Sequence, residues 1–415
     1  LAGELGSPVV LIGVWIVGGV IALCGAAVYA ELGAMMPRAV GEYVYLSRSF
    51  HPAVGFLSGW VSLLVGFSAP VALSGLACGA YLSATFPVVP PSLAGVVVIA
   101  GFTLLHMGNV LRGGRIQTLL TVYKVALIAA FVVAAFALGN GDWGHLRGDA
   151  TSATTGELAV ALVLVSFAYL GWNAAAYVAG EVHDPGRSLP RALLWGTGLV
   201  LVLYLGLNLS FFYGAGPERL AAAPEQVGAV AAQALFGTTG GAAFSLLIAV
   251  ALMSSVSAMT LSGPRIYMAM AEDGLFFRVL AKRAPSGAPA ASVALQGVLA
   301  IAMLLTSTFL GLLTYVGFTL SAFAALAVVA AFVLRHREPD TPRPYRAFGW
   351  PITPLVFLAL SVWMLVLAIV ERPLVAVSGL GTLALGLAVY ALRTRRAGTD
   401  VMTAGHSVGR NPNHL

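Results

Sequence analysis

Lys124 is the one basic side chain that lies deep inside a long apolar run of the sequence, in the segment QTLLTVYKVALIAAFVVAAFAL. It comes nine residues after Arg115, so at a helical rise of about 1.5 Å per residue its backbone lies roughly 13 Å inside the boundary of that run. An amine at that depth is costly, and such residues normally face a protein interior or a wet cavity on a substrate, ion or proton pathway. Lys124 is therefore predicted to be a functional or gating group; the alternative is a static cation bonded to carbonyls.

Serine hydroxyls in a later run, ALMSSVSAMT, could face this lysine across a cavity. Ser254 and Ser255 are the candidates for this coupling or gating role. Serines in membrane helices also pack closely and bond back to their own backbone, so a packing role stays open for them.

A second candidate site lies in the apolar segment near residues 158–179, which contains SFAYLGWNAAA. Gly171 lies beside the polar Asn173 and the aromatic Tyr169 and Trp172, at the depth expected for the middle of the bilayer. A glycine with a polar neighbour can interrupt a helix, and in lipid the freed peptide groups are tolerated only where they line a cavity. Broken helices of this kind form substrate sites in secondary transporters, although a single glycine can also serve close packing.

Charged residues gather at the predicted inner ends of several apolar segments: Glu31 and Glu42 around Arg38, and Glu181 and Asp184 with Arg187. They could form a gate of ion pairs on the cytoplasmic side. The alternative is that they are solvated or cap helix ends, where each contributes a fraction of a kcal/mol. His106 is interpreted as a satisfied histidine at the membrane interface rather than a proton relay.

Composition defines the class of protein in which these residues act. Of the 415 residues, 59% are hydrophobic and 9% are charged, whereas soluble domains carry about 25% charged residues. The chain is therefore an integral membrane protein. The net charge of +6 comes from basic residues in short loops, without the stripe expected of a nucleic-acid partner. No metal-ligand spacing, cofactor motif or HExxH, GxSxG or GxxxxGK(S/T) motif is present, so we expect no metal, no cofactor and no enzyme activity.

Eleven apolar segments are long enough, or nearly so, to cross a bilayer core that needs about 20 residues. They are Pro8–Leu32, Val54–Leu82, Ser92–Met107, Thr118–Leu138, Leu158–Ala179, Leu193–Tyr213, Ala242–Leu261, Ala291–Phe309, Leu312–Leu334, Thr353–Val370 and Leu374–Leu392. We therefore predict an all-α multi-pass transmembrane domain over residues 1–397. The polar stretch 398–415 is predicted to be a disordered cytoplasmic tail.

The basic residues also predict the orientation in the membrane. If the loop that holds Arg48 is cytoplasmic, all but three of the basic residues outside the apolar segments lie on the cytoplasmic side, as the positive-inside rule requires. The exceptions are Arg147, Arg219 and Arg372. This topology places the C-terminus in the cytoplasm and Leu1 outside, in a cell membrane that we expect to be a bacterial cytoplasmic membrane.

Four stretches of the chain resemble the amino acid–polyamine–organocation (APC) superfamily, close to its L-type and bacterial amino acid permeases. FAYLGWNAAAYVAGEVHDPGRSLPRAL is similar to that family's sixth helix and following loop. VYAELGAMMPRAVGEYVYLSRSFHPAVGFLSGW, TVYKVALIA and SGPRIYMAMAEDGLFF are similar to parts of its second and third, fifth, and eighth helices. The resemblance implies a LeuT-like fold of two inverted five-helix repeats, whose first and sixth helices are broken.

The resemblance also implies roles for particular residues. The carbonyls of Phe167, Ala168 and Tyr169 would accept the substrate ammonium, and Phe167 and Trp172 would wall or gate the site. Lys124 would occupy the place of the sodium ion in sodium-driven relatives, which favours a sodium-independent carrier. Phe318 and Ser321 are weaker candidates of the same kind.

The chain resembles helices 2 to 12 of twelve, and we expect a glycine-rich first helix to be encoded upstream of Leu1. The function expected is secondary active transport of amino acids by alternating access, as proton-coupled symport or as exchange, with an amino acid, membrane lipid and protons as the candidate partners. The alternatives are a polyamine or other organocation permease of the same fold, a substrate sensor that does not transport, and a polytopic membrane enzyme.

Overall fold

The protein is described by a computed structural model over residues 5, 7–37, 40–108, 110–147, 153–223, 226–371 and 373–407. These residues form helices joined by turns and loops, without strands. The helices are α2 (Pro8–Met35), α3 (Glu42–Ser49), α4 (Pro52–Val61), α5 (Ala69–Thr85), α6 (Pro91–Met107), α7 (Val110–Leu138), α8 (Thr155–Tyr169), α9 (Ala174–Tyr177), α10 (Pro185–Ala221), α11 (Val227–Ser262), α12 (Pro264–Glu272), α13 (Ala290–Thr306), α14 (Phe309–Arg337), α15 (Ile352–Glu371) and α16 (Pro373–Ser407).

Among the described residues, eight helical stretches are long and apolar enough to cross a membrane, and three shorter apolar helices accompany them. The eight are Pro8–Met35, Pro52–Thr85, Arg112–Leu138, Pro185–Ala221, Val227–Glu272, Gly311–Arg337, Ile352–Glu371 and Ala376–Thr394. The three shorter helices are α6, α8 and α13. Each of these stretches overlaps one of the apolar segments predicted from the sequence, and the predicted all-α multi-pass fold is confirmed.

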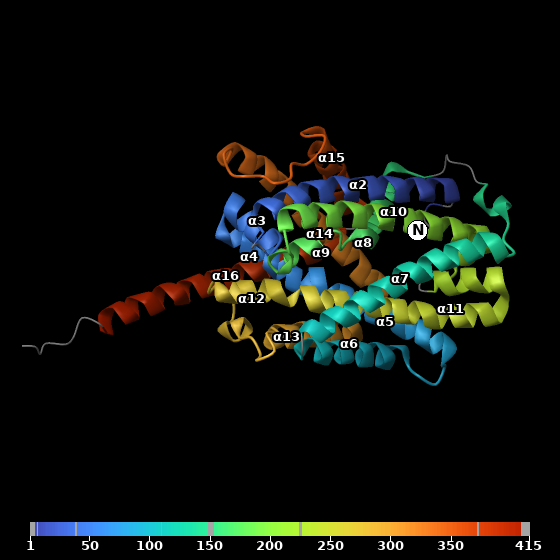
Figure 1. The fold of residues 1–415 in the computed structure, drawn as a ribbon, viewed down its shortest axis with the longest axis horizontal. Coiled ribbons are helices and arrows are strands. Elements are labelled where there is room, and N and C mark those ends of the chain that lie inside the picture. The colour runs from blue at the N-terminus through green and yellow to red at the C-terminus, as the bar shows by residue number, and fades with distance from the viewer. Residues whose placement is uncertain are drawn as a thin grey trace, which may run out of the picture.

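The helices form one bundle in which most long axes run in a similar direction (Figure 1). Helix α2 packs along α10, while α5 packs against both α6 and α11. The far end of α16 extends away from the bundle (Figure 1). The helix of α16 is described as far as Ser407, and the predicted tail of residues 398–415 stays a prediction.

Local sequence signals explain where two of these helices begin. The side chain of Ser7 accepts a hydrogen bond from the amide of Val10, and Pro8 opens α2, because a proline in the first turn lacks only an amide that has no helical partner. Thr154 and Glu157 form a reciprocal capping box that starts α8. The broken helix of the site therefore has a well-defined starting point.

Two helices extend further than hydropathy predicts. Hydropathy predicts one span that ends at Tyr213 and a next span that begins at Ala242. In the structure α10 continues to Ala221 and α11 starts at Val227. Gly216 and Gly237 lie inside them at φ +70° and +77°, so the chain bends there without leaving helical structure for long. The added turns bury Ala232 and Leu235 against α7 and α10 rather than in lipid, which explains why an apolar window missed them.

Glycines allow α5 and α6 to approach closely. A Cβ atom added at Gly79 would lie 2.0 Å from the carbonyl oxygen of Pro91, and one at Gly95 would lie 2.7 Å from the carbonyl oxygen of Gly75. Small residues at a helix interface let two backbones meet, which is how membrane helices gain packing energy without a hydrophobic driving force.

We predict that Gly79→Ala destabilises the protein by about 1–3 kcal/mol, because the new methyl group meets backbone that has to shift. The matched control is Gly101→Ala on α6, where an added Cβ meets no atom within 4 Å. The midpoint of thermal unfolding in detergent, followed by size-exclusion chromatography, should fall for the first variant and stay level or rise for the second. Equal midpoints would contradict this account of the interface.

Candidate transport site

The fifth predicted span is interrupted in its middle. Helix α8 ends at Tyr169, the chain passes through a turn at residues 170–173, and helix α9 starts at Ala174. Gly171 takes φ +111°, a conformation that side-chain-bearing residues rarely adopt. The sequence predicts an interruption at this glycine, and the turn lies there.

The turn leaves peptide groups without hydrogen-bond partners. Within the described part of the chain, the amides of Gly171, Trp172 and Asn173 and the carbonyls of Tyr169 and Leu170 make no hydrogen bond of standard length and angle. Buried peptide groups are nearly always paired, so unpaired groups of both signs beside each other mark a place for water or a ligand.

A small cavity of about 40 Å³ lies against this turn. It is well below the roughly 300–1,000 Å³ typical of small-molecule sites, so in this conformation it has room for water but not for an amino acid. It is lined by Glu42, Ser62, Gly66, Phe67, Pro70, Leu170, Gly171, Trp172, Asn173, Ala174, Tyr177, Met259, Leu320 and Ala324. We call this the central cavity. The described part of the chain holds no cluster of three or more His, Cys, Asp or Glu residues that could hold a metal ion.

The structure brings only some of the predicted binding residues to the central cavity. Gly171, Trp172 and Asn173 line it, whereas Phe167, Ala168 and Tyr169 do not. The Ala168 carbonyl accepts a hydrogen bond of 2.9 Å from Tyr204 on α10, and the Phe167 carbonyl accepts one of 2.9 Å from the Leu170 amide. A carbonyl can accept a second bond, so these two groups keep one lone pair each.

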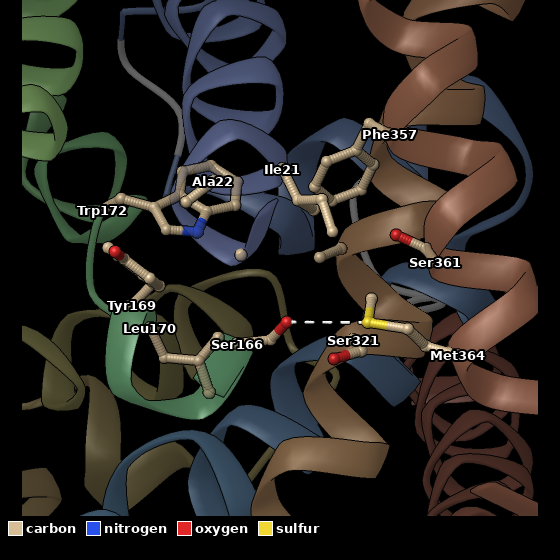
Figure 2. Close-up of a pocket in the computed structure, with 12 residues that line it drawn as sticks. Ile21, Ala22, Ser166, Tyr169, Leu170, Trp172, Ser321, Phe357, Ser361 and Met364 are labelled. Carbon is tan, nitrogen blue, oxygen red and sulfur yellow. Dashed lines mark hydrogen bonds between the residues drawn. The ribbon is translucent and has the colours of Figure 1, made fainter. Parts of the chain in front are cut away.

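A second, mostly apolar cavity lies behind the turn, between α2, α8, α14 and α15 (Figure 2). Tyr169, Trp172 and Ser321 line it, so Ser321 faces this space rather than the central cavity. The side chain of Phe318, the other candidate on this helix, lies outside the part that the structure describes. The Trp172 ring contacts Tyr29 of α2 with ring centroids 4.6 Å apart.

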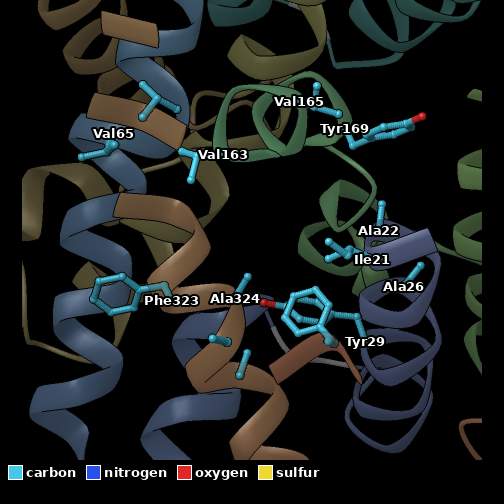
Figure 3. Close-up of a cluster of buried hydrophobic side chains, with 14 of the residues drawn as sticks. Ile21, Ala22, Ala26, Tyr29, Val65, Val163, Val165, Tyr169, Phe323 and Ala324 are labelled. Atoms are coloured by element: carbon cyan, nitrogen blue, oxygen red, sulfur yellow. The ribbon is translucent and has the colours of Figure 1, made fainter. Parts of the chain in front are cut away.

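Tightly packed side chains surround the turn. Buried residues of α2, α8 and α14 meet around it, among them Ile21, Tyr29, Val163, Tyr169 and Phe323 (Figure 3). This packing restrains the turn from several sides, so its irregular backbone is held by the fold.

Lys124 bonds one of the two predicted serines. Its Nζ lies 2.8 Å from the Oγ of Ser255, which joins α7 to α11. Ser254 is buried on the same helix but makes no hydrogen bond with the lysine. Ser255 comes one helical turn before Met259, a wall of the central cavity, so the lysine pair lies beside that cavity and not in it.

His106 has a partner for one ring nitrogen only, because its Nδ1 is buried without a hydrogen-bond partner among the described residues. It is buried between α6 and α11, and its Nε2 lies 3.0 Å from the Oγ of Ser257. This contact assigns Ser257 to holding two scaffold helices together rather than to the lysine.

Sequence reasoning missed the role of Glu42. The sequence analysis placed Glu42 in a gate of ion pairs around Arg38, a residue that lies outside the described part of the chain. In the structure Glu42 is buried and lines the central cavity. Its carboxylate accepts hydrogen bonds from the Tyr29 hydroxyl at 2.5 Å and from Asn173 Nδ2 at 3.1 Å. Burial raises the pKa of Glu42, while its hydrogen-bond donors act in the opposite direction. Only the three-dimensional position of α3 reveals this, because the motif GEY reads as an ordinary helix start.

Two other acidic residues of the predicted gate, Glu31 and Glu181, have partners different from those predicted. Glu31 is 2% exposed and binds Arg335 through two bonds of 2.8 and 2.5 Å, with Arg343 at 3.5 Å. Glu181 binds Arg265 at 2.6 Å rather than the predicted Arg187. The predicted partners were chosen by nearness in sequence, whereas these pairs join distant helices.

Taken together, a membrane-spanning helical bundle with a cavity at a broken helix defines a carrier for a small solute rather than a membrane enzyme. The family model described as amino acid permease matches residues 2–388, and the chain belongs to that family. It is 30% identical over 406 residues to the large neutral amino acids transporter small subunit 2 of Rattus norvegicus, covering 94% of this chain and 74% of that protein. It is 29% identical over 356 residues to the serine/threonine exchanger SteT of Bacillus subtilis, covering 85% and 81%. The expected family, transport class and absence of enzyme activity are confirmed.

We predict that Glu31→Ala destabilises the protein by about 3–5 kcal/mol, because it leaves the charges of two arginines without their buried partner. The control is Glu272→Ala, which breaks an exposed pair of 3.4 Å with Arg283 and should cost less than about 1 kcal/mol. Urea unfolding of both variants in detergent provides the comparison. A loss for Glu31→Ala no larger than that of the control would show that the buried cluster is not a structural anchor.

Proposed function

We propose that this permease binds a neutral amino acid at the turn of residues 170–173 and carries it across the membrane by alternating access. The observation that carries the proposal is the turn that lines the central cavity, with the unpaired amides of Gly171, Trp172 and Asn173 and the unpaired carbonyl of Leu170. Amides suit a carboxylate and carbonyls suit an ammonium group, so the turn matches the two charges that every free amino acid has in common.

The cavity walls support a substrate without a charged side chain. Phe67, Met259, Leu320 and Ala324 face the space across from the turn. Apolar walls with a few polar groups orient a small ligand and favour an apolar or small neutral side chain. The names of the two relatives, a large neutral amino acids transporter small subunit and a serine/threonine exchanger, agree with this substrate class.

We propose that transport is independent of sodium. The amine of Lys124, anchored on Ser255 next to the cavity, would supply the positive charge that a bound cation provides in sodium-driven carriers. The likeness to an exchanger favours obligatory exchange over proton symport. Purified protein in liposomes should therefore accumulate labelled amino acid only when unlabelled amino acid is loaded inside, with the same rate in sodium and in choline buffer.

We also propose that the loops rich in arginine, together with the C-terminus, face the cytoplasm of a bacterial cell. Arg335 lies at the end of α14, Arg343 lies in the loop that follows it, and Arg265 lies at the start of α12. The positive-inside rule assigns these positions to the cytoplasmic side. A reporter fused after residue 407, active only in the cytoplasm, tests this orientation.

The second candidate is a permease for polyamines or other organic cations, and Glu42 is the observation that favours it. A carboxylate in the wall of a cavity attracts amines, whereas a neutral amino acid does not need it. Competition by putrescine that exceeds competition by leucine, serine and threonine would favour this candidate. Binding of amino acids without any flux would favour a sensor.

We predict that Gly171→Ala lowers substrate affinity at least about tenfold, because alanine is strained by more than about 1 kcal/mol at this φ and moves the unpaired amides. The control is Gly198→Ala on α10, where an added Cβ meets no atom within 4 Å. Affinity is measured as the concentration of unlabelled amino acid that halves counterflow of the labelled one. Unchanged affinity for Gly171→Ala would remove the turn from the binding site.

We predict that Lys124→Ala abolishes exchange while the protein still inserts in the membrane and elutes as a folded species. The reason is that α7 and α11 lose the polar bond of 2.8 Å between Lys124 and Ser255 beside the cavity. The control is Lys282→Ala, since Lys282 is the other lysine of the sequence and is exposed. Exchange at the wild-type rate in Lys124→Ala would show that the lysine is a static structural cation.

A further inference from the structure

Glu42 is the one acidic residue among those that line the central cavity. It is the first residue of α3 and follows Gly41, which takes φ +58°. A Cβ atom at Gly41 would lie 2.2 Å from the ring of Tyr177, so the glycine lets the start of α3 press against α9. The carboxylate is thereby buried, with the whole residue 4% exposed.

Neutral donors from two other elements surround this carboxylate. Tyr29 of α2 donates to it at 2.5 Å, and Asn173, at the start of α9, donates at 3.1 Å. Tyr177 of α9 also hydrogen-bonds to it and accepts a bond from Asn173 Nδ2 at 3.1 Å. The carboxylate therefore ties α9, the second half of the broken helix, to α2 and α3.

Several other titratable and charged groups on the elements packed around Glu42 have partners of their own, whereas the buried hydroxyl of Tyr45 has none among the described residues. On α2, Glu31 forms ion pairs with Arg335 and Arg343. On α3, Tyr43 donates to Asp273 and Arg48 binds Glu338. On α14, Arg337 donates to the carbonyl of Ser49, and Tyr45 of α3 lies near Glu42 as a buried neutral phenol. Within the described residues, no lysine or arginine forms an ion pair with Glu42. Among the described residues, the groups that hydrogen-bond to Glu42 are therefore neutral hydroxyls and an amide.

A buried carboxyl without a cationic partner binds a proton more tightly than the same group in water. Burial raises the pKa of Glu42 in the conformation described here. Water that reaches the carboxylate removes this cause and returns the pKa towards its ordinary value. By linkage, acid then favours the conformation in which Glu42 is buried, and alkaline conditions favour the one in which it is hydrated.

We propose that Glu42 is a proton-binding site linked to the opening of the central cavity. The carboxyl holds a proton while α9 is closed against α2 and α3, and it releases the proton to water when α9 moves away. This inference rests on the proposed transport function, because it assigns a role to opening and closing in that cycle. Its ligand is the proton alone; the charged amine of a substrate at the same carboxylate is the competing outcome of the test.

The first test measures exchange of labelled amino acid in proteoliposomes with equal pH inside and outside, between about pH 5 and about pH 8. The wild-type rate should rise severalfold as the pH rises, because loss of the proton favours opening. Glu42→Gln is permanently neutral, so its rate should be flat and close to the slow acid rate of the wild type. Glu42→Asp keeps a titratable group and should keep a pH-dependent rate.

A second variant tests the same carboxyl without removing it. Tyr29→Phe keeps the ring that packs against Trp172 but removes one donor to the carboxylate. The midpoint of the rate profile should move to higher pH by about one unit, because a lost donor favours the protonated form. Tyr213→Phe, in an aromatic cluster with Phe136 and Trp143, is the control and should leave the midpoint where it is.

Stability supplies a readout that does not need transport. Because burial raises the folded-state pKa of Glu42 above its unfolded value, the wild type should be most stable, relative to Glu42→Gln, at acid pH and lose that advantage as the pH rises. Thermal unfolding in detergent across the same pH range measures the difference.

The outcomes separate this inference from the function on which it rests. A pH-independent wild-type rate, or a Glu42→Gln rate that still rises with pH, overturns the proton site while amino acid exchange stands. Flux of no amino acid overturns the proposed function, and the stability difference then decides on Glu42 alone. A third outcome combines a flat pH profile of the wild-type rate with a Glu42→Gln variant that no longer binds putrescine but still binds neutral amino acids. This outcome would show that the carboxylate binds an amine, and it would overturn the proton site.

Discussion

Peptide groups inside a membrane need hydrogen-bond partners, and the turn at residues 170–173 is where this protein leaves some of them without one. Elsewhere in the described spans the bends at Gly216 and Gly237 interrupt helices that continue directly afterwards. At Gly171 the interruption instead lines a cavity with residues 170–173. Unsatisfied groups at such depth cost several kcal/mol each in lipid, so the arrangement is tolerable only with water or a ligand present.

The turn keeps its shape because side chains from other helices fix the residue that follows the glycine. The indole of Trp172 fits against Gly25 of α2, where an added Cβ would lie 2.9 Å from it, and lies edge-on to Tyr29. Phe357 of α15 approaches the same glycine from the other side. One glycine on α2 thus makes room for the aromatic residue that holds the broken helix, and its loss would displace the turn indirectly.

The sequence was sufficient to predict the fold, the position of the interruption and the meeting of Lys124 with Ser255, for physical reasons. Long apolar runs have few alternatives in lipid, a glycine beside a polar residue is conspicuous at bilayer depth, and a lone amine requires a polar partner. The partners of Glu31 and Glu181 and the burial of Glu42 could not be predicted in this way. Each depends on which helix ends meet in space, and a pair such as Glu31 with Arg335 leaves no signal in local spacing.

Two ionisable groups of opposite type flank the broken helix, and they are attached to different parts of the bundle. Lys124 connects α7 with α11, whereas Glu42 connects α2 and α3 with α9. A zwitterionic substrate adds no net charge between them, so binding leaves each group's protonation to be decided by its own access to water. The amine thus lies in the scaffold beside the cavity, whereas the carboxyl of α3 is bonded to α9, the half-helix that is proposed to move. The proposed substrate recognition by the turn and the proposed proton binding at Glu42 would therefore be distinct properties of neighbouring residues. They are joined through Asn173, which lines the cavity and donates to the carboxylate.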